Sequence, residues 1–222
     1  KRYSKNEIIH ATKRLSEIGG KKFNKSTLDL INYNGTQKFN GNWLPSDLFK
    51  GKEVLILGSG QSIKNHKFAI ESYIKKYKPF VISLNINQYI NSSFIDLIAS
   101  CHPFRLLTDY EIHKYIGTPL VIPFSQLSNE INNLKKIKKC YNYELSIQDN
   151  YFSYTAKDCI IPKLLVFSYT MAIVNSGKAE KIFLVGFDGY NSDDERNNEM
   201  NSFLSLYSSL NLITVTSLTP SK

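Results

Sequence analysis

Apolar and polar positions follow two alternating patterns from residue 51 onward. Short runs of branched apolar residues, typical of buried strands, lie at residues 54–57, 80–84, 94–99, 120–122, 182–185 and 212–215. Segments with apolar residues at helical spacing lie between them, at residues 64–77, 108–115, 125–134, 164–175 and 195–208. This alternation predicts an α/β fold, with a three-layer, Rossmann-like, mostly parallel sheet covered by helices on both faces. The segment 138–153 fits neither pattern, and we expect a hairpin or a lid there.

The beginning of the chain predicts two short helices. Ser4 and Glu7 have the spacing of a capping box, and a single apolar stripe follows them. The glycine pair at residues 19–20 is a typical helix end. A second short helix is expected at residues 26–31.

An Asn- and Gly-rich stretch at residues 32–42 reads as a linker. The segment that follows it begins with Trp43, and we expect it to pack as an anchor against the next domain. The sequence therefore predicts a small helical extension at residues 1–50 and a Rossmann-like domain at residues 51–222.

Composition places the chain among ordinary globular proteins. Hydrophobic residues make up 42% and charged residues 21% of the 222 positions, and no apolar run approaches the roughly 20 residues that span a bilayer. The first residues show no signal-peptide pattern, and the missing initiator Met suggests a domain cut from a longer protein. The three cysteines are far apart and odd in number, so we expect free thiols in a reducing cytoplasm.

Three kinds of partner would explain the net charge of +9: a nucleic acid, an anionic membrane surface or an anionic small molecule. No nucleic-acid-binding module can be recognised in the sequence, so we expect no nucleic-acid partner. A plain solvated surface rich in lysine explains the charge without a partner, and we favour it over an electropositive approach to an anionic small molecule.

A glycine turn directly follows the first strand of the predicted sheet, and it is made of Gly58, Ser59, Gly60, Gln61 and Ser62. Such a turn lies at the carboxyl end of its strand, where ligands bind, and its backbone can approach an anion closely. Ile63 stands where the dinucleotide fingerprint has its third glycine, and no Gly-Lys-Ser/Thr follows as in a P-loop. The turn therefore predicts a phosphate-bearing small molecule other than a dinucleotide or P-loop ligand, and no cofactor.

Two further strands end in polar residues that should reach the same sheet edge. Asn85 follows the second strand, where its amide can contact a base or ribose or simply form a turn. His102 follows the third strand and is a candidate proton carrier, phosphate ligand or structural histidine. Arg105 lies one turn further on and could pair with a phosphate.

The strand at residues 182–185 leads into another candidate stretch, which contains Phe187, Asp188, Gly189 and Tyr190. Asp188 can bind ribose hydroxyls, a metal or a substrate proton, while the two aromatic rings supply flat walls. The stretch at residues 193–201, which begins with the acidic cluster 193–195, has three open interpretations: helix capping, recognition of sugar hydroxyls or a cation site. We assign no metal to it.

Residues 54–62 resemble the opening turn of small bacterial sialyltransferases that use CMP-sialic acid, and of related flagellin-modifying proteins. Residues 80–89 resemble their second strand with its nucleotide-contacting Asn, at Asn85 here. Residues 164–175 and 181–190 resemble their late helix and strand, which end in a similar Gly-x-Asp. The resemblance covers residues 51–216 and implies a sialyltransferase-like fold that binds a CMP-sugar.

The whole chain resembles more closely the C-terminal region of aldolase-type proteins from bacterial surface-polysaccharide gene clusters. Those proteins carry an N-terminal barrel similar to 4-hydroxy-2-oxovalerate aldolases, which would be the partner of this chain. The segments that carry the resemblance are residues 2–4, 19–23, 101–103 and 187–200.

One departure from the sialyltransferase pattern affects the expected activity. The family has a catalytic His after the Gly-x-Asp strand, whereas this chain has no His after His113. A transferase of this type would have to use His102 or Asp188. The sequence thus predicts a glycosyltransferase-like domain for a CMP-activated sugar acid. The alternative is a non-catalytic domain, appended to an aldolase barrel, that binds a sugar phosphate or organises a homo-oligomer.

Overall fold

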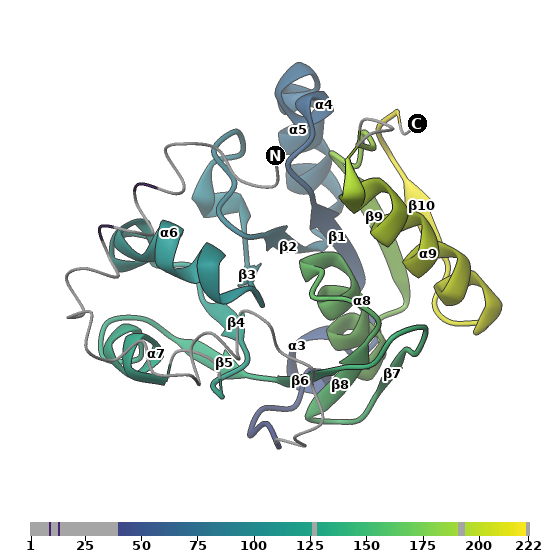
Figure 1. Cartoon of the computed structure of the whole chain (residues 1–222). Helices are drawn as coiled ribbons and strands as arrows, with labels where there is room; N and C mark the ends of the chain where they lie inside the picture. The colour runs from purple at the N-terminus through teal and green to yellow at the C-terminus, as the bar shows by residue number, and fades with distance from the viewer. Residues whose placement is uncertain (1–8, 10–12, 14–39, 126–127, 191–193, 221–222) are drawn as a thin grey trace.

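A seven-stranded sheet forms the centre of the molecule (Figure 1). The computed structural model describes residues 9, 13, 40–125, 128–190 and 194–220. The strand order is β10-β9-β1-β2-β3-β4-β5, and every neighbouring pair is parallel. The strands are β1 (Glu53–Leu57), β2 (Phe80–Leu84), β3 (Leu97–Ala99), β4 (Leu120–Ile122), β5 (Cys140–Asn142), β9 (Lys181–Val185) and β10 (Val215–Ser217). The predicted Rossmann-like α/β fold is therefore confirmed.

Helices cover both faces of this sheet, as the alternation predicts. They are α3 (Ser46–Phe49), α4 (Gln61–Asn65), α5 (Lys67–Tyr77), α6 (Pro103–Tyr115), α7 (Ser128–Leu134), α8 (Val166–Ser176) and α9 (Glu195–Ser209). The predicted helix at 64–77 is divided into α4 and α5 at His66. Helix α6 begins five residues before its predicted start, because Pro103 suits a first helical turn and His102 caps it.

Strand β1 shows how the two faces are built. Val54 and Ile56 belong to the core cluster that also contains residues of α8 and α9. Leu55 and Leu57 belong to the opposite cluster, with residues of α5, α6 and α7. All four side chains have 0% exposure, and burial of each contributes about 1.5–3 kcal/mol. Successive side chains of β1 therefore pack against the helices on opposite faces of the sheet, which gives the fold its three layers.

Two strands differ from their predicted limits. Strand β3 starts late because Asn91 caps a short 3₁₀ helix, η2 (Ser92–Phe94), which ends on the first residue of the predicted strand. Strand β10 starts late because side chains engage the backbone of Ile213: the Tyr207 hydroxyl donates to its carbonyl and Asn175 accepts from its N–H.

The segment 138–153 forms neither an isolated hairpin nor a lid. Its first part is β5, the edge strand of the main sheet. Its next part is β6 (Glu144–Ile147), which pairs in parallel with β8 (Asp158–Ile161), and β7 (Ser153–Tyr154) completes this three-stranded second sheet. The Glu144 carboxylate fixes the start of β6, because the N–H and hydroxyl of Ser125 donate to it at 3.0 and 2.7 Å.

The anchor expected at Trp43 is confirmed. Its ring lies 4.6 Å from that of Tyr141 and 6.1 Å from that of Phe49, and only 8% of the residue is exposed. The two helices predicted before residue 32 lie outside the described residues, apart from Ile9 and Lys13, which are helical. The three cysteines are free. None of the helices among the described residues is long and apolar enough to cross a membrane.

Helix α6 contains a buried histidine, His113, that the sequence gives no reason to single out. It is 1% exposed, and its Nδ1 atom has no hydrogen-bond partner among the described residues. Burial, reinforced by the charge of Lys138, lowers the pKa of His113 from 6.5 to about 3. The folded state therefore holds this imidazole in its neutral form.

We expect His113 to make the protein sensitive to acid. Between pH 6.5 and about 3 the unfolded state binds the His113 proton and the folded state does not, so stability falls as the pH drops through this window. The loss is at most about 5 kcal/mol. Urea unfolding at pH 7, 5 and 4 should show a smaller pH dependence for His113→Leu than for wild type. Equal pH dependence in both proteins would contradict this assignment.

Candidate functional site

A cleft of about 620 Å³ opens at the carboxyl ends of the parallel strands. Its volume is in the range of small-molecule sites. The predicted residues that line it are Gly58, Ser59, Gly60, Asn85, His102, Arg105, Phe187, Asp188, Gly189 and Tyr190. Of the predicted site residues, only Gln61 and Ser62 are not among the lining residues. Four strand ends that are far apart in the sequence thus meet at one site.

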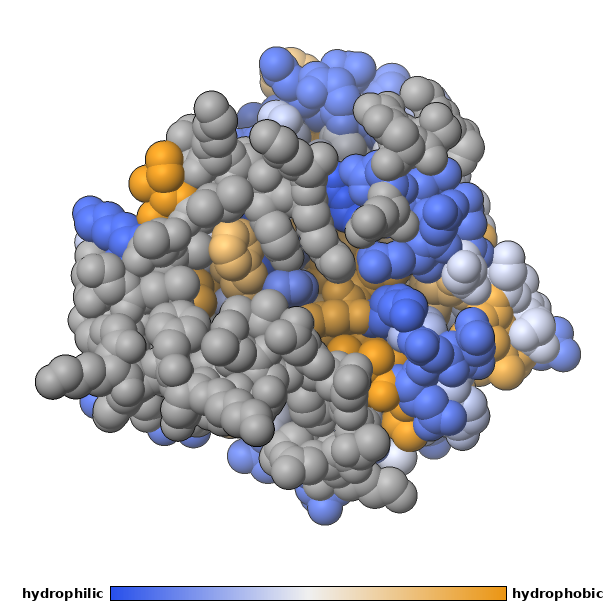
Figure 2. All heavy atoms as spheres, in the orientation of Figure 1, coloured by the Kyte–Doolittle hydropathy of each residue, from blue (hydrophilic) through white to orange (hydrophobic). Residues whose placement is uncertain are grey.

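Two helices complete the cleft with residues that were not named among the predicted site residues. The start of α8 contributes an apolar wall, Leu164, Leu165, Val166 and Phe167. Helix α9 contributes Arg196, Asn197, Met200, Asn201 and Leu204. The spacing of the α9 residues marks one helix face, which was the available signal. Figure 2 shows hydrophobic surface near the centre of the view, with hydrophilic residues to its right.

The glycine turn packs closely against the end of β9. A Cβ on Gly58 would lie 2.4 Å from the Gly186 carbonyl oxygen, and one on Gly60 would lie 2.5 Å from the Asp188 side chain. The Gly60 N–H donates to the Gly186 carbonyl at 2.9 Å. These glycines therefore allow the ends of β1 and β9 to come together, and their expected contact with a ligand stays a prediction.

Asp188 occupies the start of α4, where a phosphate was expected. The N–H of Ser62 donates to its Oδ2 atom at 2.7 Å, and the Ser62 hydroxyl donates to Oδ1. A carboxylate in this place satisfies a helix N–H that would otherwise lack a partner. Asp188 lines the cleft, but its oxygens already stabilise the turn, which argues against the predicted role as catalytic base.

Asn85 lies at the predicted edge in a left-handed conformation, with φ of 59°. Its backbone is held from both sides, since its N–H donates to Ala99 and its carbonyl accepts from the Ser83 hydroxyl. Its side-chain Oδ1 atom is buried and has no hydrogen-bond partner among the described residues. A buried acceptor without a donor costs about 1–3 kcal/mol, which a ligand N–H or O–H could offset.

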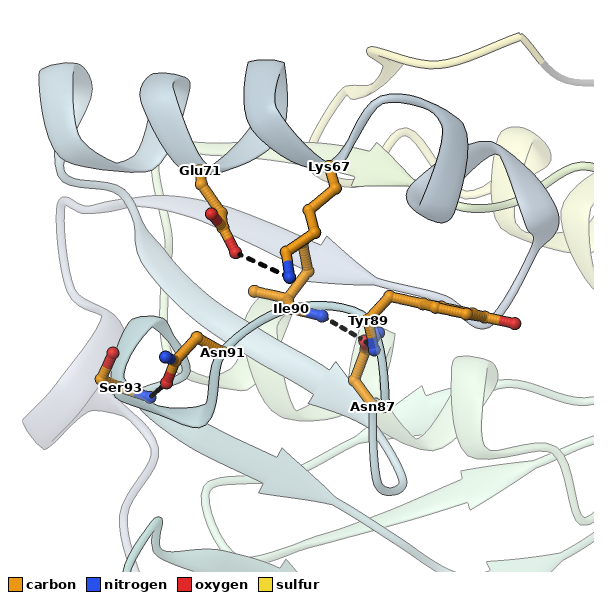
Figure 3. A network of polar contacts seen from close by, with 7 residues as sticks. All are labelled: Lys67, Glu71, Asn87, Tyr89, Ile90, Asn91 and Ser93. Carbon is orange, nitrogen blue, oxygen red and sulfur yellow. Dashed lines mark hydrogen bonds and ion pairs between the residues drawn. The ribbon is translucent and has the colours of Figure 1, made fainter.

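Asn87 braces the loop that carries Asn85 (Figure 3). Its Oδ1 atom accepts from the N–H groups of Tyr89 and Ile90 at 2.9 and 3.0 Å. Its Nδ2 atom donates to the Gly58 carbonyl at 3.1 Å. One side chain thus ties the loop after β2 to the glycine turn.

His102 is the N-cap of α6. Its Nδ1 atom accepts from the Phe104 N–H at 3.2 Å, so the proton of the neutral ring is assigned to Nε2. In this tautomer the Nε2 atom of His102 is a hydrogen-bond donor. The predicted role as proton carrier would require the ring to give up this capping bond first.

Each arginine of the cleft has a carboxylate partner in the chain. Arg105 Nε lies 3.2 Å from Oδ2 of the buried Asp109. Arg196 donates to Asp194 through Nε at 2.9 Å and Nη2 at 2.6 Å. The hydrogen bonds from Arg196 hold the pKa of the Asp194 carboxyl well below its usual range. The cleft is therefore less electropositive than the net charge of the chain suggests.

The aromatic walls predicted at residues 187 and 190 are present. The Phe187 ring packs on Phe167 with centroids 4.8 Å apart, and the Arg196 guanidinium lies 4.6 Å from the Tyr190 ring centroid. Asp194 is the N-cap of α9, which accounts for one member of the acidic cluster at 193–195, while Asp193 lies outside the described residues. The described residues contain no group of three or more His, Cys, Asp or Glu residues arranged to hold a metal.

Comparison of the chain with family models and with curated proteins gave no match in either case.

Replacing Asp188 tests the contact that holds the glycine turn. We expect Asp188→Ala to lower the free energy of unfolding by about 1–3 kcal/mol, because Ser62 loses both acceptors. Asp149→Ala is the matched control, since Asp149 forms an exposed ion pair with Lys163 and should change stability by less than about 1 kcal/mol. Urea unfolding measures both; equal effects of the two substitutions would contradict the assigned role.

Proposed function

We propose that this chain binds a nucleotide sugar, specifically a CMP-activated sugar acid, in the cleft at the carboxyl edge of its sheet. In this role it is a sialyltransferase-like glycosyltransferase domain of bacterial surface-polysaccharide synthesis. The observation that carries the proposal is the convergence of polar residues from four strand ends on one cleft of suitable volume.

The polar groups suggest how the nucleotide would lie. The unpartnered Oδ1 atom of Asn85 suits the amino group of a base or a ribose hydroxyl. His102 and Arg105 lie together at the start of α6, where the positive end of the helix favours a phosphate. The phosphate is therefore assigned to α6 and not to the glycine turn, since Asp188 already occupies the turn.

For transfer, the site would have to stabilise the leaving nucleotide phosphate. Arg105 and the Nε2–H group of His102 would supply positive charge and a hydrogen bond to the leaving oxygen. This assignment makes His102 a donor to the leaving group and gives Asp188 a structural role.

The contacts that His102 and Asp188 make at helix starts favour a second function. His102 and Asp188 both serve as helix caps, and His102 is the only histidine among the described residues that line the cleft. A site with no ready base suits a non-catalytic domain that binds a sugar phosphate beside an aldolase barrel. Release of CMP from CMP-sialic acid by the purified protein separates the two functions, because only the transferase turns its donor over.

Calorimetric titration with CMP tests the binding itself. We expect wild type to bind CMP with a Kd on the order of 1 mM or tighter, and Asn85→Gly to weaken binding about tenfold, the effect of one lost hydrogen bond. Glycine keeps the left-handed backbone, so only the amide is lost. Asn150→Gly is the matched control, because Asn150 is an exposed Asn with φ of 57° that does not line the cleft. No binding at millimolar CMP, or equal affinity in Asn85→Gly, would contradict the proposal.

A further inference from the structure

We propose that strand β10 is a docking edge for a second copy of this chain, and that the β10 strands of two copies pair antiparallel across a two-fold axis. Strand β10 ends one side of the main sheet, and among the described residues it pairs only with β9 (Figure 1). The pairing needs no ligand in the cleft, so it does not depend on the proposed function.

The backbone of β10 has hydrogen-bonding groups on its outer side. The Thr214 carbonyl accepts from β9 at 3.4 Å, and the Leu218 N–H donates to β9 at 2.8 Å. Backbone groups of successive residues point to opposite sides of a strand, so Val215 and Ser217 present their N–H and carbonyl groups away from β9. A partner strand can therefore bind here without breaking a hydrogen bond of the sheet.

The flanking residues set the register of this pairing. The backbone of Ile213 is already bound by side chains of α8 and α9, and the Thr219 carbonyl accepts from the Ser217 hydroxyl at 2.8 Å. Only Val215 and Ser217 are left for a partner. When two such strands run antiparallel, Val215 of each copy exchanges hydrogen bonds with Ser217 of the other, and Thr216 faces itself on the two-fold axis. The edge is thus complementary to its own copy.

The distribution of charge favours a second copy as the partner. Residues 200–221 contain no Asp, Glu, Lys, Arg or His, although 21% of the chain is charged. Two copies with a net charge of +9 repel each other, and the repulsion is smallest where two neutral surfaces meet. Thr216 is exposed and Leu218 is 42% exposed. In this register Leu218 lies opposite Thr214 of the second copy, which would cover part of its apolar surface.

The opposite edge of the same sheet is protected against such pairing. Strand β5 follows a stretch that contains lysines 135, 136, 138 and 139, and the Lys139 ammonium lies 4.9 Å from the Tyr141 ring centroid. Lysines beside an edge strand discourage pairing with another chain. Strand β10 and the residues around it contain no charge, and an uncharged segment rich in Thr, Val, Ile and Leu favours strand pairing. The contrast between the two edges indicates that β10 takes a partner.

Sedimentation velocity over a range of protein concentrations tests the pairing. We expect a reversible monomer–dimer equilibrium with a Kd between about 10 µM and 1 mM, because a short strand pair buries little area. Thr216→Lys should raise this Kd at least about tenfold, since two like charges then face each other. Thr216→Val keeps a β-branched side chain without charge, and Asn132→Lys adds the same charge on the exposed side of α7. Both controls should dimerise at least as tightly as wild type.

Mixing two charged variants tests the register itself. Thr216→Lys and Thr216→Glu should each be monomeric alone and should form a mixed dimer when combined, because opposite charges then lie across the axis. Far-UV circular dichroism checks that each variant is folded. A wild-type protein that is monomeric up to about 1 mM would overturn the inference, since even weak specific interfaces associate in this range. Dimers that persist in Thr216→Lys, or a mixture that stays monomeric, would also overturn it.

Discussion

The close contact between the ends of β1 and β9 is the constraint on which the site depends. The Gly60 N–H meets the Gly186 carbonyl, and Asp188 meets Ser62, so the two strand ends hold each other across 126 residues of sequence. Any side chain at Gly58 or Gly60 would collide with this partner. The same contact sets the floor of the cleft and places Phe187 and Tyr190 on its wall. The contact between the ends of β1 and β9 therefore determines both the packing of the two strands and the shape of the cleft.

A second constraint is electrostatic. The helix start at α4, Arg105 and Arg196 are all groups that attract anions, and each has a carboxylate of the chain beside it. This pairing stabilises the free protein, because none of these groups has to remain desolvated without a partner. Among the described residues of the cleft, the buried Oδ1 atom of Asn85 is a polar atom that has no such partner.

Much of this site could be predicted from the sequence, for a simple reason. Parallel strands end at one edge, so residues that directly follow strands converge whatever the distance between them in the chain. Asn85, His102 and Asp188 were found in this way. Arg196 and Asn201 share one face of a predicted helix, but the sequence does not place that face in the cleft, because how α9 crosses the sheet edge is not encoded in a local pattern. The cap made by Asp188 and Ser62 was missed for the same reason: sequence shows that a helix starts, and not which distant carboxylate satisfies it.

The most direct measurement of the central claim is a crystal structure of the protein soaked with CMP. The account predicts density in the cleft, with the nucleoside at Asn85 and the phosphate at the start of α6 beside His102 and Arg105, while Asp188 keeps its contact with Ser62. Density for the phosphate at the glycine turn with Asp188 displaced would contradict the assignment of the anion site. An empty cleft at millimolar CMP would contradict the account as a whole.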